Sequence, residues 1–164
     1  MTRKSLKIEI AEGEFEFYET PNINEKSKIE KIMVELLGGS KALADIDYRI
    51  REAANSHNKH CREKFGQSVY LEKLKEIEKL EKAGITNEYF YNLYNEVNNN
   101  PHYIEFMNLL TKKAKAADYG HLVVMVKNNP KGISLETCNF MILDKILEQV
   151  VKQRNEIKTE QIIN

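Results

Sequence analysis

The sequence predicts a mainly α-helical fold with a minor β component, an N-terminal β-hairpin followed by a bundle of five to six helices. Two observations carry this prediction. Apolar and charged residues alternate on both sides of a glycine near the N-terminus, and apolar stripes at three- and four-residue spacing follow between helix-capping residues. The chain of 164 residues suits one domain, with the hairpin over 1–20, a helical body over 24–154 and a polar tail over 155–164 that we expect to fray.

Apolar residues alternate with charged ones on both sides of Gly13. Period-two alternation around a glycine-containing turn is typical of a β-hairpin with one apolar face. A hairpin alone is marginally stable, so we expect a helix or another strand against that face. The residues of the apolar face are Leu6, Ile8, Ile10, Phe15 and Phe17.

Amphipathic segments follow, bounded by residues that typically cap helices. An apolar, β-branched run near 121–127 lies between the last two of these segments. It predicts one extra short strand or, equally, a buried helical turn. The expected helical ranges run from after Asn24 to near Gly38, from Ser40 to near Gly84, from after Thr86 to near Asn98, from Pro101 to near Tyr119, and from after Ser134 to near Arg154.

The range 40–84 is the longest periodic stretch in the chain. Unbroken, it would form a helix of about 65 Å at about 1.5 Å per residue, which is too long for a domain of this size. We therefore expect Gly66 to kink or break it, or part of it to project. Beyond Gly66 the apolar stripe continues between Glu/Lys pairs. We expect another element to cover this stripe, either the helix after Gly84 or a second subunit. The candidate partner-binding residues on this stripe are Tyr70, Leu74, Ile77 and Leu80.

His57, His60 and Cys61 lie at positions i, i+3 and i+4 of the expected helix. This spacing puts an imidazole pair and a thiolate on one helix face, where one zinc ion could accept them. The alternative is that these residues are semi-polar fillers of a helix seam, and we expect no cofactor. No catalytic triad, phosphate loop or dinucleotide motif accompanies them, which favours a protein that is not an enzyme. The candidates for a fourth ligand are His102, His121 and Cys138.

Basic residues cluster on the expected helix before Gly66, and a second group, Lys112, Lys113 and Lys115, lies near the end of a later helix. With tyrosines that could stack on bases, the clusters leave nucleic-acid binding open as an alternative function. Lysines in a last helical turn also suit the helix dipole, which is the simpler explanation of the second group. The candidate nucleic-acid contacts are Arg49, Arg51, Lys59, Arg62 and Lys64.

The order of hairpin, proline turn and amphipathic helix over Leu6 to Leu37 resembles the start of tail assembly chaperones of tailed phages. That resemblance implies a phage accessory protein, such as a chaperone or an inhibitor of a host factor. It covers only this N-terminal part and brings no functional residues with it.

The charge balance, the cysteines and the hydropathy narrow the class of protein. The chain carries 25 basic and 25 acidic side chains, which argues against the field of one sign that most nucleic-acid binders carry. Cys61 and Cys138 are far apart and lie in no motif, so we expect no disulfide. No signal-peptide pattern and no membrane-length apolar run is present. We therefore expect a cytoplasmic protein, of a bacterial cell or an infected host, that binds another protein or itself without catalysing a reaction.

Overall fold

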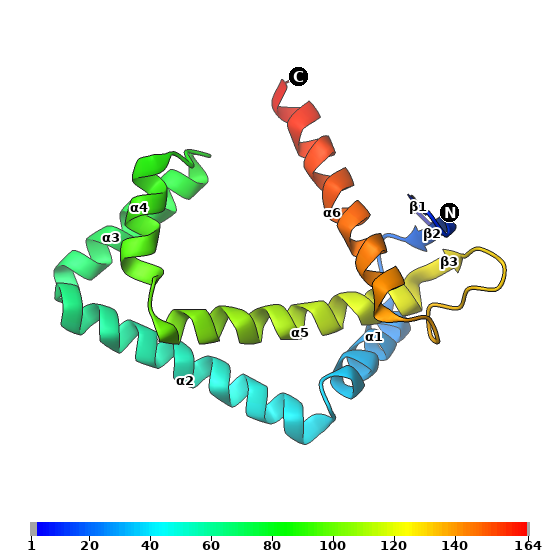
Figure 1. Ribbon diagram of the computed structural model, residues 1–164, viewed down its shortest axis with the longest axis horizontal. Helices are drawn as coiled ribbons and strands as arrows, with labels where there is room; N and C mark the ends of the chain where they lie inside the picture. The colour runs from blue at the N-terminus through cyan, green and yellow to red at the C-terminus, as the bar shows by residue number, and fades with distance from the viewer. Residues whose placement is uncertain (1–2, 164) are drawn as a thin grey trace. The chain divides into compact units, whose positions relative to one another are not determined.

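The computed structural model describes residues 3–163, with side chains described as far as Glu156. Its described part contains six helices and three strands (Figure 1). This confirms the predicted mainly α fold with an N-terminal hairpin. The elements in chain order are β1 (Ser5–Ile10), β2 (Gly13–Tyr18), α1 (Ile23–Leu36), α2 (Ser40–Phe65), α3 (Gln67–Lys82), α4 (Glu88–Asn98), α5 (Pro101–Met125), β3 (Val126–Asn128) and α6 (Phe140–Ile163).

The chain forms two compact units. Unit 1 comprises residues 1–39 and 114–164, and unit 2 comprises residues 40–113. Each unit has its own buried apolar cluster. Helix α5 begins in unit 2 and ends in unit 1 without a break. None of the described helices is both long and apolar enough to cross a membrane.

A three-stranded antiparallel sheet in the order β1-β2-β3 forms one side of unit 1. The hairpin pairs Ile8 with Phe15, and both side chains are fully buried. Gly13 adopts a positive φ of 137° at the turn, a conformation that glycine tolerates best. The sheet packs on residues of α5 and α6, so of the two expected partners for the apolar face, a helix or another strand, helices cover it. The buried cluster is Ile8, Phe15, Phe17, Tyr119, Leu122, Leu135, Leu143 and Ile146.

The third strand exists but is shorter than the predicted run of 121–127. Helix α5 continues past the predicted stop near Tyr119 and ends at Met125, and only Val126–Asn128 is extended. Leu122 and Met125, three residues apart, are both buried, so one helix face satisfies the same apolar run that a strand would. Short apolar runs are ambiguous between the two structures for this reason.

Two predicted helix starts are wrong. Helix α1 is capped by Asn22 rather than Asn24, in a capping box in which the Asn22 side chain accepts from the Glu25 amide and the Glu25 carboxylate accepts from the Asn22 amide. Helix α6 begins at Phe140 rather than near Ser134, because the preceding segment turns to bury Leu135 in the core. Helix α6 itself extends to Ile163; the side chains beyond Glu156 lie outside the described residues, so fraying of the tail stays a prediction.

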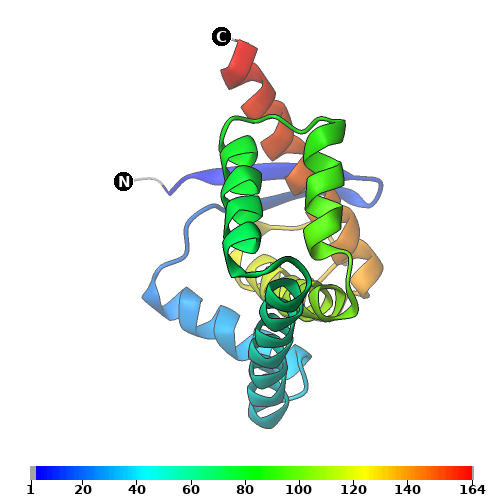
Figure 2. The ribbon, with the colours of Figure 1, turned by 90° about the vertical axis from the view of Figure 1, so that its left-hand side faces the viewer.

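Unit 2 is built from α2, α3, α4 and the first half of α5. Gly66 separates α2 from α3, with φ 82° and ψ 152°, so the long stretch is two helices and the expected break at Gly66 is the alternative that holds. Helices α3 and α4 lie side by side (Figure 2). The buried cluster of this unit is Cys61, Tyr70, Ile77, Leu80, Phe90, Leu93 and Val97.

Candidate functional site

A buried polar network joins α2 to the junction between α4 and α5. The side-chain amide of Asn100 lies 3.0 Å from Nδ1 of His57 and donates to the Val97 carbonyl at 3.3 Å. The Cys61 thiol donates to the same carbonyl at 3.4 Å, and its sulfur lies 3.8 Å from both ring nitrogens of His57. Burial lowers the pKa of His57 and raises the pKa of Cys61, so the neutral forms of both are favoured.

His60 does not join this network. Its side chain is exposed, and its ring lies beside that of His102, with 6.1 Å between the ring centroids. The helix therefore brings His57 and Cys61 together and leaves His60 apart from them. Among the described residues, no group of three or more His, Cys, Asp and Glu side chains could hold a metal ion. The network satisfies its own polar groups, which is the arrangement of a structural site.

Most of the predicted partner-binding stripe is buried inside unit 2. Tyr70, Ile77 and Leu80 pack against α4, while Leu74 is 37% exposed. The sequence left two candidates for covering this stripe, the helix after Gly84 and a second subunit. The helix after Gly84, which is α4, covers it. The hydroxyl of Tyr70 also donates to the Asn58 side chain at 2.7 Å, which ties α3 back to α2.

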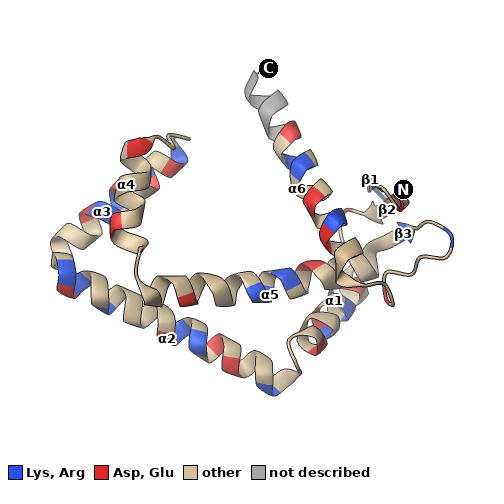
Figure 3. Ribbon diagram, viewed as in Figure 1, with Lys and Arg blue, Asp and Glu red and all other residues tan. Residues whose placement is uncertain are grey.

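The basic residues of α2 are exposed, and acidic residues lie among them (Figure 3). Arg49 pairs with Glu105 at 3.3 Å, and the Lys64 ammonium lies 5.2 Å from the centre of the Phe65 ring. In the second group, Lys113 pairs with Asp47 at 2.8 Å, and Lys115 pairs with Asp144 at 3.3 Å. A nucleic-acid role for Arg51, Lys59 and Arg62 stays a prediction.

The first half of α5 carries apolar residues on two faces. Glu105, Leu109 and Lys113, at four-residue spacing, form the face turned to α2: the two charged residues pair with α2, and Leu109 is buried. The other face carries Ile104, Met107 and Leu110, which are 52%, 39% and 36% exposed. These three residues are named here the α5 stripe. Helical periodicity in the sequence does not say which of the two faces is covered, and a single neighbouring helix can bury only one of them.

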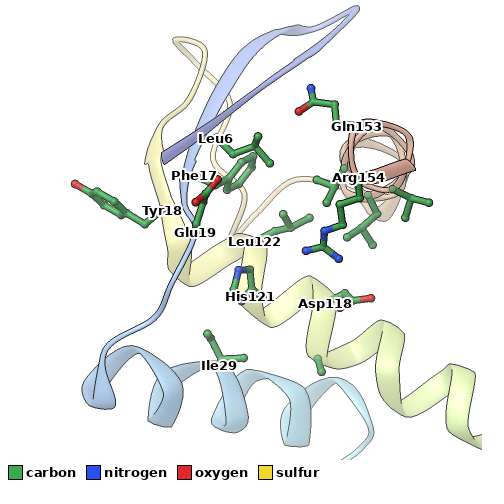
Figure 4. Close-up of a pocket in the computed structure, with 14 residues that line it drawn as sticks. Leu6, Phe17, Tyr18, Glu19, Ile29, Asp118, His121, Leu122, Gln153 and Arg154 are labelled. Atoms are coloured by element: carbon green, nitrogen blue, oxygen red, sulfur yellow. The ribbon is translucent and has the colours of Figure 1, made fainter. Parts of the chain in front are cut away.

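A cavity of about 510 Å³ lies in unit 1, between the sheet, α1, α5 and α6 (Figure 4). Its wall is mainly apolar, and Asp118, His121 and Arg154 line it together. Burial raises the pKa of Asp118 and lowers the pKa of His121, so the surroundings disfavour the charged form of each. No local sequence pattern predicts this cavity, because its lining comes from β1, β2, α1, α5 and α6.

Comparisons with protein-family models, with curated proteins and with solved structures found no significant match to this chain.

Proposed function

We propose that the protein is a non-enzymatic interaction protein that uses the α5 stripe as its binding face. The observation that supports this function is the exposure of Ile104, Met107 and Leu110 on one side of a helix whose opposite side is fixed by ion pairs to α2. Neighbouring apolar side chains exposed on a structured helix are typical of a surface that is covered in a complex.

The occupant that fits the stripe is a second copy of the chain. The three residues are spaced evenly, with Met107 midway between Ile104 and Leu110. A two-fold axis at Met107 would bring two copies of α5 together antiparallel, with Met107 against its own copy and Ile104 against Leu110. Such self-complementarity is what a symmetric dimer contact requires. Because the three side chains are already half-buried, the added apolar burial is modest and the dimer is expected to be weak.

Light scattering on purified protein over a concentration series tests the proposal. The mass should rise from that of one chain, 19.1 kDa, toward twice that value as the protein reaches ~100 µM, a range suited to a contact of this size. Met107→Glu should keep the circular dichroism spectrum and stay monomeric. Ile23→Glu is the matched control, since Ile23 is 84% exposed in unit 1, and this variant should dimerise like the wild type.

A wild-type mass that stays at one chain over the whole series would overturn self-association, and so would a Met107→Glu variant that dimerises normally. A photo-crosslinking amino acid at position 107 distinguishes the alternative partner. If it captures a different protein in cells, and Met107→Glu abolishes complex formation with that protein, that protein replaces the second copy as the occupant of the α5 stripe.

A cytoplasmic location is part of the same proposal. It is supported by Cys61 and Cys138, which both carry free thiols and belong to different units. Cell fractionation tests it, and recovery of the protein outside the cytoplasmic fraction would contradict it.

A further inference from the structure

The cavity of unit 1 is of the size that binds small molecules. Its volume of about 510 Å³ falls within the range of ~300–1,000 Å³ typical of ligand pockets. Elements distant in the sequence hold its walls together. The Gln153 side chain donates to the Lys7 carbonyl at 3.3 Å and so ties α6 to β1, while Gly120 lets α5 approach the backbone of α1 at Ile29.

The body of the cavity is apolar. Leu6 and Phe17 line it from the sheet, Leu122 from α5, and Leu147 and Val150 from α6. These side chains offer no hydrogen bond, so a ligand that fills this part must itself be apolar to compensate for the loss of water.

The polar groups are concentrated between α5 and α6. Figure 4 shows the guanidinium of Arg154 directed from α6 toward α5, on the side where Asp118 and His121 lie. Within the part of the chain whose side chains are described, Arg154 makes neither an ion pair nor a hydrogen bond through its side chain, and the same is true of Asp118. The planar guanidinium, with its fork of N–H donors, matches a carboxylate in two parallel hydrogen bonds.

We propose that this cavity binds a small amphipathic carboxylic acid, with its apolar chain against Leu6, Phe17 and Leu122 and its carboxylate on Arg154. Asp118 lies in the same wall; burial raises its pKa, while the charges of Arg154 and His121 lower it. His121 is favoured in its neutral form and keeps one N–H donor for the same group. The site lies in unit 1 and does not depend on the α5 stripe or on dimerisation.

Three probes of equal chain length separate the chemistry of the head group from the apolar effect. Octanoate, octanol and octylamine are titrated into the full-length protein by calorimetry. Octanoate should bind with one site per chain and about tenfold more tightly than octanol, because only the carboxylate gains charge-assisted hydrogen bonds. Octylamine should bind more weakly than octanoate, since its ammonium would face Arg154.

Two variants locate the site. Arg154→Gln should reduce octanoate affinity to the level of octanol and leave octanol unchanged, whereas Lys152→Gln, the same charge change at an exposed position of α6, should leave both unchanged. Val150→Trp should fill the cavity and weaken both probes, with retention of the circular dichroism spectrum as the check on folding. The proposal is overturned if octanoate binds no better than octanol, if octylamine binds more tightly, if binding does not saturate near one site, or if Arg154→Gln binds octanoate like the wild type.

Discussion

The side-chain amide of Asn100 lies 3.0 Å from Nδ1 of His57, and its carbonyl oxygen accepts from the backbone amide of Tyr103 at 3.1 Å. Asn100, which is buried, thus caps the start of α5 and also contacts His57 of α2. Because an amide NH₂ group can only donate, Nδ1 of His57 must accept, and this requires a neutral imidazole.

Acidification should destabilise unit 2 through His57. Its pKa in the folded protein is depressed below the ordinary 6.5, first by burial, so the unfolded chain binds a proton more readily. The stabilising contribution is complete above about pH 6.5 and is lost as the pH falls from that value through the folded-state pKa. Urea unfolding at about pH 7.5 and about pH 5.5 measures the loss.

His57→Gln should narrow the difference in stability between the two pH values. It should not abolish it, since burial also lowers the pKa of His121 and gives a contribution of the same sign. Asn55→Gln, a neutral change at an exposed position of α2, is the control and should keep the wild-type difference. A His57→Gln protein with an unchanged pH dependence would contradict the assignment.

Replacing Gly66 should destabilise the α2–α3 junction. Its combination of φ 82° and ψ 152° lies in a region that is almost exclusive to glycine, so Gly66→Ala should cost about 1–3 kcal/mol. No atom lies within 4 Å of the Cβ that alanine would add, so the cost comes from the backbone and not from a clash. Thermal unfolding measures it, with Gln67→Ala at the adjacent exposed position as the control. Equal melting temperatures for the two variants would show that the junction is not strained.

Replacing Gly120 should destabilise unit 1 for a different reason. A Cβ at this helical position would lie 2.9 Å from the carbonyl oxygen of Ile29, and a backbone atom cannot move aside as a flexible side chain does. Gly120→Ala should therefore cost about 1–3 kcal/mol as α1 and α5 are forced apart. Chemical denaturation measures this, and Thr111→Ala, at an exposed site of the same helix, should stay within ~0.5 kcal/mol of the wild type. A Gly120→Ala variant as stable as that control would contradict the close approach.

Glu16 should stabilise the sheet above pH 4.5 and lose this role in acid. Ser5 donates to its carboxylate at 2.6 Å from β1, Asn128 donates at 3.1 Å from β3, and Lys127 lies 3.4 Å away. These contacts, with that of Ser5 the largest, lower the pKa of Glu16 from 4.5 to about 2. Because the folded-state pKa is depressed, the stabilisation is lost as the pH falls from 4.5 to about 2.

Glu16→Gln should therefore lower the urea midpoint at neutral pH, and the gap to the wild type should close in acid. Glu14→Gln, an exposed position on the same strand, is the control and should show little effect at either pH. A gap that persists at about pH 2 would mean that the charge of Glu16 is not the cause.

The parts of the fold that follow local rules could be predicted from the sequence. Alternation fixes the hairpin face, and Gly13 and Gly66 mark the turn and the helix break, because each position needs a backbone conformation that glycine adopts most easily. The start of α1 was predictable too, since Asn22 and Glu25 have the spacing of a capping box, a stronger signal than Asn24 alone.

The functional surfaces depend on tertiary packing. The spacing of apolar residues in the sequence does not show which helix face another element covers. The stripe through Tyr70 and Ile77 and the α5 stripe both have the three- or four-residue spacing of a helix face, yet α4 covers the first and leaves the second exposed. Similarly, His57 and His60 are both near Cys61 in sequence, but only the position of Asn100 decides which of them enters the buried network. The cavity of unit 1 requires residues as distant as Leu6 and Arg154, so no local pattern contains it.

Unit 2 is one continuous segment, whereas unit 1 is assembled from the two ends of the chain. During synthesis, residues 40–113 are made before β3 and α6. The hairpin and α1 are made before unit 2, but the hairpin's apolar face packs on Leu122, Leu143 and Ile146, which are made after unit 2. Unit 2 is therefore the part of the chain that can reach its native contacts early, and a ribosome-bound nascent chain in which residues 1–125 are followed by a linker that spans the exit tunnel should protect residues 40–113 from protease while leaving the hairpin accessible.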